Sequence, residues 1–310
     1  MLSRFLVVLF QVITLFIMIG VGFALGRLKI VTEKGTKEMS AVLINVATPS
    51  IILTSFQIDW DSQFLVTLGT GFLAMIACYV IFMFLVKPLY RKQPEDRRVC
   101  LQIGSMYGNV GFMGIPLISA VLGSSNVIYA VLAIAAFNMM IFTHGAIVMG
   151  GRKAASVKSI VTNTVMISLI VSIALMLLRI RIPSPIFNAL TFLGNLSTPL
   201  SMLVIGAQLS RSELSGFFSK PVIYAASAVK MMILPIITMV LLFPFHFDKT
   251  FYIAAVILFA APTGGYTSIF AERYHRDVAF AANFVSLCTL LSVITLPLAA
   301  ILAEYLTTLY

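Results

Sequence analysis

Long apolar runs, separated by short polar or charged stretches, follow one another along the whole chain. A helix that crosses about 30 Å of bilayer hydrocarbon needs about 20 predominantly apolar residues. Because the runs reach this length, the pattern predicts an all-α polytopic membrane protein with ten transmembrane helices. The predicted spans are residues 5–26, 36–56, 63–87, 98–122, 126–150, 157–178, 186–209, 220–243, 250–272 and 278–305.

The amino-acid composition agrees with a membrane protein and argues against a soluble enzyme or a nucleic-acid-binding protein. Of the 310 residues, 60% are hydrophobic and 10% are charged, and the mean hydropathy is +1.04. A soluble domain carries about a quarter charged residues. Ten spans leave little chain for anything but connectors, so no extramembrane catalytic domain is expected. The net charge of +10 indicates basic loops facing the lipid bilayer, and no nucleic acid is expected as a partner.

Basic residues set the predicted orientation. Those in the loops after spans one, three, five, seven and nine are Arg27, Lys29, Lys34, Lys37, Lys87, Arg91, Lys92, Arg97, Arg98, Arg152, Lys153, Lys158, Arg211, Lys220, Arg273 and Arg276. The opposite side carries Arg4, Arg179, Arg181 and Lys249. By the positive-inside rule the first group is cytoplasmic, so both termini are expected on the outer side of the cell (inner) membrane.

A short pattern recurs in the two halves of the chain. The sequence N-x-x-T-P begins at Asn45 and again at Asn195, 150 residues later, in the second predicted span of each half. With five spans per half, residues 1–152 and 153–310 enter the membrane in opposite senses. The pattern predicts two inverted five-helix repeats, a recurring plan among secondary transporters. Asn45 and Asn195 are secondary candidates for a substrate-binding site.

Spans four and nine contain helix-breaking residues. Four glycines, an asparagine and a proline lie within residues 104–116, and residues 261–266 read APTGGY. Proline removes a backbone donor and glycine favours unwinding, so both spans are predicted to be broken crossover helices. Small residues also allow close helix packing in membranes, which would explain one such span. Two, at matching positions of two halves, point to a transport site.

The breaks predict an anion site. The N-terminal ends of half-helices present free N–H groups with partial positive charge, and two such ends bind an anion without lysine or arginine. Pro116 suits the first turn of one resumed helix, and Thr263 is expected to cap the other. Asn109 adds an amide, for which an interhelical hydrogen bond is the alternative role. The candidate substrate-binding residues are Asn109, Gly111, Gly114, Ile115, Pro116, Pro262, Thr263, Gly264 and Gly265.

Two ionisable residues inside predicted spans are further secondary candidates. Lys230, near the middle of span eight, supplies countercharge for an anion or, alternatively, snorkels or pairs with backbone carbonyls. His144, in span five, is a candidate for proton coupling or a hydrogen-bonded bundle residue. No Asp or Glu falls near the centre of a predicted span, so neither a carboxylate proton relay nor a carboxylate-based sodium site is predicted. Carbonyls of unwound segments remain as ligands for a cation, and the choice of coupling cation (H⁺ or Na⁺) stays open. No metal site or cofactor is predicted.

Residues 109–117, NVGFMGIPL, resemble the N-x-x-x-M-G-I-P-L crossover of the auxin efflux carrier family. This family includes plant PIN carriers and bacterial permeases for malonate, malate and similar acids. Residues 262–264, followed by FAERY at 270–274, resemble its second crossover. The ten-span layout with both termini outside also agrees, so the resemblance covers the whole chain.

The resemblance implies an elevator-type carrier. Spans one, two, six and seven would form a scaffold and the surface of a homodimer, and spans three to five and eight to ten would form a mobile transport domain. Asn109 would be a substrate ligand. The chain departs from many plant members in lacking a long hydrophilic loop and in having Thr263 where they often have glutamine. Both departures favour a bacterial-type carboxylate carrier over an auxin carrier.

Two other functions are alternatives to the transport of a small mono- or dicarboxylate. A polytopic membrane enzyme needs paired acids, a Ser/His set or a metal cluster. Three scattered histidines (His144, His246 and His275) and the absence of acids near span centres argue against an enzyme. A sodium-coupled symporter of the bile-acid type would have a similar architecture, and sodium-dependent substrate binding would identify it.

Overall fold

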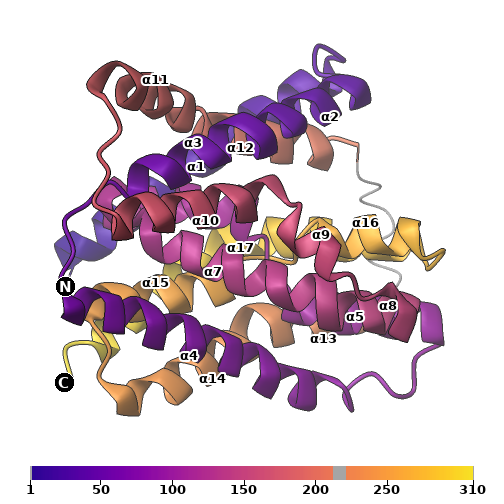
Figure 1. Cartoon of the computed structure of the whole chain (residues 1–310). Helices are drawn as coiled ribbons and strands as arrows, with labels where there is room; N and C mark the ends of the chain where they lie inside the picture. Colours follow the sequence, from indigo (N-terminus) through magenta and orange to yellow (C-terminus); the bar gives the residue numbers. More distant parts are fainter. Residues whose placement is uncertain (1, 212–220, 310) are drawn as a thin grey trace. The chain divides into compact units, whose positions relative to one another are not determined.

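The computed structural model describes residues 2–211 and 221–309, which fold almost entirely into helices (Figure 1). Over these residues no strand forms, and β-type pairing is limited to one bridge between Gly108 and Thr263. The predicted all-α class is therefore confirmed. Lys220, assigned above to a cytoplasmic loop and to the start of span eight, lies outside the described residues, as does residue 310 at the end of the second predicted repeat.

The chain divides into two compact units. Unit 1 comprises Met1–Gly69, Gly111–Ala135 and Lys158–Arg211. Its main helices are α1 (Leu2–Arg27), α2 (Glu33–Val42), α3 (Thr48–Ser55), α6 (Ile115–Leu122), the first part of α7 (Val127–Met140), α9 (Val157–Val161), α10 (Thr164–Leu177), α11 (Ser184–Asn195) and α12 (Ser197–Leu209).

Unit 2 comprises Thr70–Val110, Ala136–Val157 and Ser212–Tyr310. Its main helices are most of α4 (Ser62–Val86), α5 (Glu95–Met106), α8 (Ala146–Gly150), α13 (Pro221–Ala228), α14 (Leu234–Leu242), α15 (Lys249–Ala260), α16 (Tyr266–Arg273) and α17 (Val278–Leu306). Short 3₁₀ turns are η3 (Ser124–Asn126), η5 (Arg152–Ala154) and η8 (Phe243–Phe245). The assignment of scaffold and transport domains stays a prediction.

An apolar helix lies at each of the ten predicted spans, but three of these helices are shorter than a membrane crossing requires. Seven in the described part of the chain reach 18 residues and are apolar enough to cross a membrane: Phe10–Arg27, Glu33–Ser55, Ser62–Val86, Val127–Gly150, Ser184–Leu209, Pro221–Phe245 and Val278–Leu306. Shorter apolar helices, Val110–Leu122, Thr164–Leu177 and Lys249–Ala260, lie within predicted spans four, six and nine. Fourteen residues of α10 extend only about 21 Å, less than the hydrocarbon thickness. The ten-span count and the inverted repeats therefore stay predictions.

Several long helices contain a π-helical turn that the apolar pattern did not predict. These turns are η1 (Leu43–Ala47), η2 (Val110–Gly114), η4 (Ile141–Gly145) and η7 (Val229–Ile233). Such bulges occur often at functional sites. Both copies of N-x-x-T-P lie at irregular points: η1 contains Asn45, and α11 ends at Asn195.

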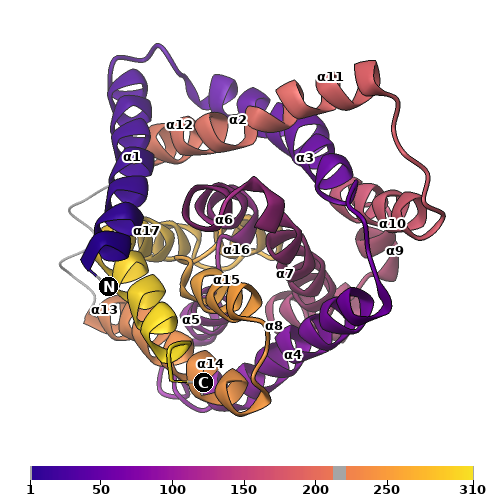
Figure 2. The same cartoon turned by 90° about the vertical axis from the view of Figure 1, so that its left-hand side faces the viewer.

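In unit 1, α1 packs against α12 through glycines (Figure 2). A Cβ on Gly22 would stand 2.4 Å from the carbonyl oxygen of Leu203, and a Cβ on Gly206 would stand 2.0 Å from that of Ile19. Gly22 and Gly26 form a G-x-x-x-G pattern on α1. Small residues at this spacing let helix backbones approach closely in a membrane, so the backbone approach itself holds these two helices together.

In unit 2, α15 forms the core, because every residue from Phe251 to Ala260 except Ile253 is buried. It packs against α14 and α17. The starts of α5 and α17 are joined by Arg97, whose Nε lies 3.0 Å from Asp277 Oδ2 and whose guanidinium lies over the ring of Phe280. This packing fixes the neighbours of the segment that follows α15.

Candidate functional site

Both predicted helix interruptions are present. α5 ends at Met106, and helical backbone resumes in η2 at Val110. α15 ends at Ala260, and α16 begins at Tyr266. The backbone leaves the helical region directly after each helix, with Tyr107 at φ −102° and ψ 105° and Ala261 at φ −53° and ψ 140°. Glycine and proline in these stretches disfavour a continuous helix, as the sequence predicts.

The extended segments 107–109 and 262–264 cross and pair with each other inside unit 2. The pairing consists of Asn109 N to Pro262 O (2.7 Å), Gly264 N to Tyr107 O (2.9 Å) and an antiparallel bridge between Gly108 and Thr263. Backbone outside helices is tolerated at membrane depth only where the protein or water satisfies it. Each broken helix therefore supplies hydrogen bonds that the other lost, and we call these six residues the crossover.

Close backbone approach at the crossover requires glycine. A Cβ on Gly264 would stand 2.8 Å from the carbonyl oxygen of Gly108. A Cβ on Gly108 would stand 3.0 Å from the oxygen of Ala261 and 3.1 Å from Nζ of Lys230. Gly265, by contrast, is exposed and has open space around a built Cβ. The two adjacent glycines at 264 and 265 thus have different roles.

The prediction that Thr263 caps the resumed helix is wrong. Its hydroxyl donates 2.9 Å to the carbonyl of Gly104 in α5, and its Oγ1 lies 3.2 Å from Sγ of Cys288 in α17. Gly265 precedes α16, with no side-chain cap. The hydroxyl turns to α5 because one of that helix's last carbonyls is freed by the break. Thr263 therefore links the segment between α15 and α16 to α5 and α17 rather than capping α16.

Pro116 lies in the first turn of α6, as predicted, but it does not mark the point where helical backbone resumes. The π-helical turn η2 precedes α6 directly, so the free N–H groups belong to residues from Val110 onward. Gly114, Ile115 and Pro116 are buried, whereas Gly111 has open space around a built Cβ. These four candidates belong to unit 1, and the crossover belongs to unit 2.

Tyr107 connects the crossover to His144. Its hydroxyl donates to the carbonyl of Met140 (3.1 Å) and lies 3.0 Å from Nδ1 of His144. Its ring stacks on Tyr79 with centroids 5.4 Å apart. His144 is thus one hydrogen bond from the crossover, which supports neither of its two predicted roles over the other. The sequence did not single out Tyr107, although it stands inside the glycine-rich stretch.

Lys230 lies directly against the crossover. It is 1% exposed, and its Nζ donates 2.9 Å to the carbonyl of Phe259, the penultimate residue of α15. Of the two predicted alternatives to function, snorkelling is wrong and pairing with a carbonyl is confirmed. Asn45 and Asn195, by contrast, are exposed and belong to unit 1.

A cavity of about 520 Å³ in unit 2 is lined by α4, α5, η4, α8 and the turn between α4 and α5. Lys87, Arg91 and Arg98 line it, and so do Met106 and His144 beside the crossover. Of the ion pairs among the described residues, none involves these three basic side chains. The cavity therefore combines three basic side chains and one carboxylate, Glu95, with a wall that includes His144, the hydrogen-bond partner of Tyr107.

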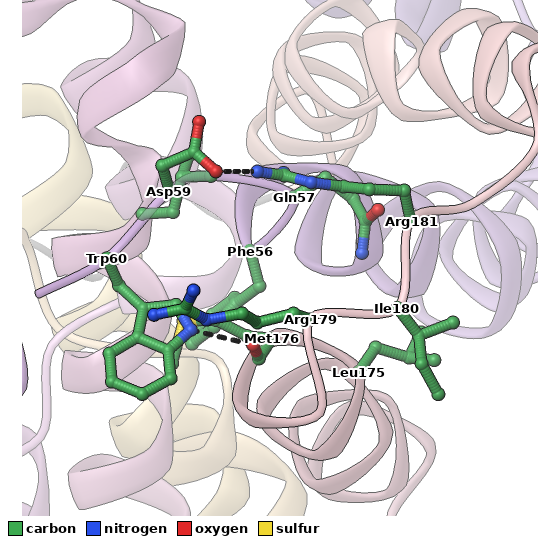
Figure 3. A pocket seen from close by; sticks show the side chains of 10 residues that line it. Phe56, Gln57, Asp59, Trp60, Leu175, Met176, Arg179, Ile180 and Arg181 are labelled. Carbon is green, nitrogen blue, oxygen red and sulfur yellow. Dashed lines mark hydrogen bonds and ion pairs between the residues drawn. The ribbon is translucent and has the colours of Figure 1, made fainter.

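A smaller cavity in unit 1, of about 290 Å³, lies where α3 and α10 end (Figure 3). Asp59 pairs with Arg181, and the indole N–H of Trp60 donates 2.7 Å to the carbonyl of Met176. The guanidinium of Arg179 lies over the Trp60 ring, 5.3 Å from its centroid. Because the polar groups that line this cavity mostly bind one another, we interpret it as the contact between the loops that follow α3 and α10.

Comparisons with known proteins agree with the geometry. The chain is 24% identical over 298 residues to an uncharacterized transporter of Methanocaldococcus jannaschii, covering 93% of this chain and 96% of the relative. It is 22% identical over 300 residues to an uncharacterized transporter of Methanothermobacter thermautotrophicus, covering 93% and 95%. The family described as "Membrane transport protein" matches residues 7–164 and 155–300. The chain therefore belongs to this family, the auxin efflux carrier family that its crossover motifs resemble, and is a multi-pass membrane transporter rather than an enzyme.

Proposed function

We propose that this protein is a secondary transporter for a small organic anion, a mono- or dicarboxylate, held at the crossover. The observation that carries the proposal is the pairing of residues 107–109 with 262–264, which leaves a helix start after each segment. Free N–H groups at helix starts favour a negative charge. The crossover thus offers backbone donors to a carboxylate.

Asn109 is the proposed side-chain ligand. Its backbone N–H is already bound to Pro262, which fixes the position of its Cα in the crossover. Its amide adds a donor and an acceptor next to the start of η2. The side chains of Pro262 and Thr263 are buried within unit 2, so we expect them to shape the site rather than to exchange with solvent.

The proposed mechanism is alternating access of the elevator type. Ten spans in two inverted repeats would give a scaffold from spans one, two, six and seven, and a mobile transport domain from the other six. The same proposal includes a homodimer, both termini on the outer side of the cell membrane, and H⁺ or Na⁺ as a coupling cation if one is used. The recurrence of interrupted helices at spans four and nine supports this plan.

The proposal predicts ligand-dependent stability. Purified protein should melt at a higher temperature with at least one small carboxylate, because a ligand that binds only the folded state stabilises it by about 2.7 kcal/mol at 100 times its Kd. Asn109→Ala should weaken this shift and lower uptake into liposomes by about tenfold or more, since a hydrogen bond to a charged group contributes about 1.5–3 kcal/mol.

Asn188→Ala, at an exposed position in α11, is the matched control and should behave as wild type. The proposal fails if no mono- or dicarboxylate shifts the melting temperature and none is transported. Unchanged binding and uptake by Asn109→Ala would remove that residue from the site.

The basic cavity predicts a second, salt-dependent effect. Replacing Arg91 and Arg98 together by glutamine should raise the KM for carboxylate about tenfold at low ionic strength, because focused positive charge concentrates an anion. The difference should shrink as salt is added, since the Debye length falls to about 8 Å at 0.15 M. Lys92→Gln, which removes an exposed charge outside the cavity, should leave KM unchanged. Equal KM values for the two variants would contradict an access role.

A further inference from the structure

Lys230 is a buried cation that none of the described acidic residues neutralises. It forms no ion pair with any of them, and it is 1% exposed. A buried ammonium without a counter-charge costs several kcal/mol even after relaxation. The Lys230 ammonium therefore needs another interaction that stabilises its charge, and the groups around Nζ show which one it is.

The compensation comes from the end of a half-helix. The last four carbonyls of a helix lack intrahelical partners, and the C-terminal end carries partial negative charge. Phe259 is one residue from the end of α15, and its carbonyl accepts the hydrogen bond from Lys230 at 2.9 Å. The ammonium therefore replaces the amide that a continuous helix would have supplied.

The first crossover segment and the end of α15 both lie against this ammonium. The Cβ position of Gly108 is 3.1 Å from Nζ, so the first segment passes directly over it. Lys230 itself lies in the π-helical turn η7, which displaces its side chain from regular α-helical phase. Its charge thus stands at the point where one helix has ended and the other segment crosses.

Half-helix C-terminal ends and unwound carbonyls are the groups that coordinate Na⁺ in carriers with broken helices. We infer that the ammonium of Lys230 occupies the place of such a coupling cation. The chain itself then supplies the positive charge at the crossover, and the site binds no sodium ion. The inference rests on the proposed function, since it specifies how the same site carries an anion. Lys230 is a positioning residue that holds the end of α15, and its charge also stabilises a nearby anion.

The test separates charge from packing. Wild-type carboxylate uptake into liposomes should be the same when choline replaces Na⁺. Lys230→Ala should lose about tenfold or more of that uptake in choline, the loss expected for a charge-assisted hydrogen bond. Na⁺ or n-propylammonium, which fits the volume removed, should restore part of it. Lys230→Met fills the volume without charge and should show the loss but no restoration.

A second readout needs no substrate. The melting temperature of purified Lys230→Ala should rise with Na⁺ or n-propylammonium concentration, and that of wild type and of Lys249→Ala, an exposed lysine of α15, should not. Three results would overturn the inference. The first is a wild-type protein that requires Na⁺ for uptake, and the second is full uptake by Lys230→Met in choline. The third is the absence of any cation effect on Lys230→Ala in both the uptake and the melting measurements. Should wild type bind and carry no carboxylate, the proposed function fails while this melting series still decides the role of Lys230.

Discussion

Gly264→Ala is expected to lower carboxylate uptake by about 10- to 100-fold, because overpacking a close contact costs about 1–3 kcal/mol and 1.4 kcal/mol is a factor of ten. The added methyl group would stand 2.8 Å from the carbonyl oxygen of Gly108. That oxygen belongs to backbone, so it cannot rotate away as a side chain can. Relieving the contact requires the two crossover segments to separate, which weakens the hydrogen bond from Gly264 to Tyr107.

Gly265→Ala is the matched control for this prediction. The same substitution one residue later meets open space, and Gly265 has φ −58°, which alanine adopts without strain. We expect its uptake and its melting temperature to stay near wild type, within the roughly 0.4–1 kcal/mol typical of a compatible Gly→Ala change. Uptake that falls equally in both variants would show that the loop is sensitive to any change, and the specific crossover contact would then not explain the loss.

The interruption of spans four and nine could be predicted from sequence because its cause is local. Proline and glycine act on the backbone of their own turn, so the cluster at 104–116 identifies the break without knowledge of the fold. The ends of α5 and α15 agree with that expectation. Whether Asn109 and its neighbours bind substrate is a different question, which the proposed binding experiments address.

The partners at the crossover could not be predicted, because they come from distant parts of the sequence. Thr263 bonds to Gly104 and contacts Cys288, neither of which a local capping rule includes. For Lys230 the sequence left two kinds of partner open, and only the structure identifies the Phe259 carbonyl. The π-helical turns were missed for another reason: one extra residue per turn barely alters the apolar pattern of a helix that is apolar on all sides.

Gly22→Ala is expected to destabilise unit 1 by about 1–3 kcal/mol or more, which lowers the melting temperature by roughly 2–12 °C. The methyl group would stand 2.4 Å from the carbonyl oxygen of Leu203, so α1 and α12 must move apart. Helices in a membrane associate through close packing rather than through the hydrophobic effect. The packing energy lost when α1 and α12 separate is therefore not offset by burying apolar surface elsewhere. Fluorescence-detected melting of the purified protein measures the change.

Gly20→Ala provides the control on the same helix, since a Cβ there has nothing within 4 Å. Gly206→Ala tests the contact from the other side, because its Cβ would stand 2.0 Å from the carbonyl oxygen of Ile19. If both clashes disrupt one interface, the double variant Gly22→Ala/Gly206→Ala should lose less stability than the sum of the two single losses. Additive losses, or equal melting of the Gly20 and Gly22 variants, would mean that close backbone approach does not hold α1 to α12.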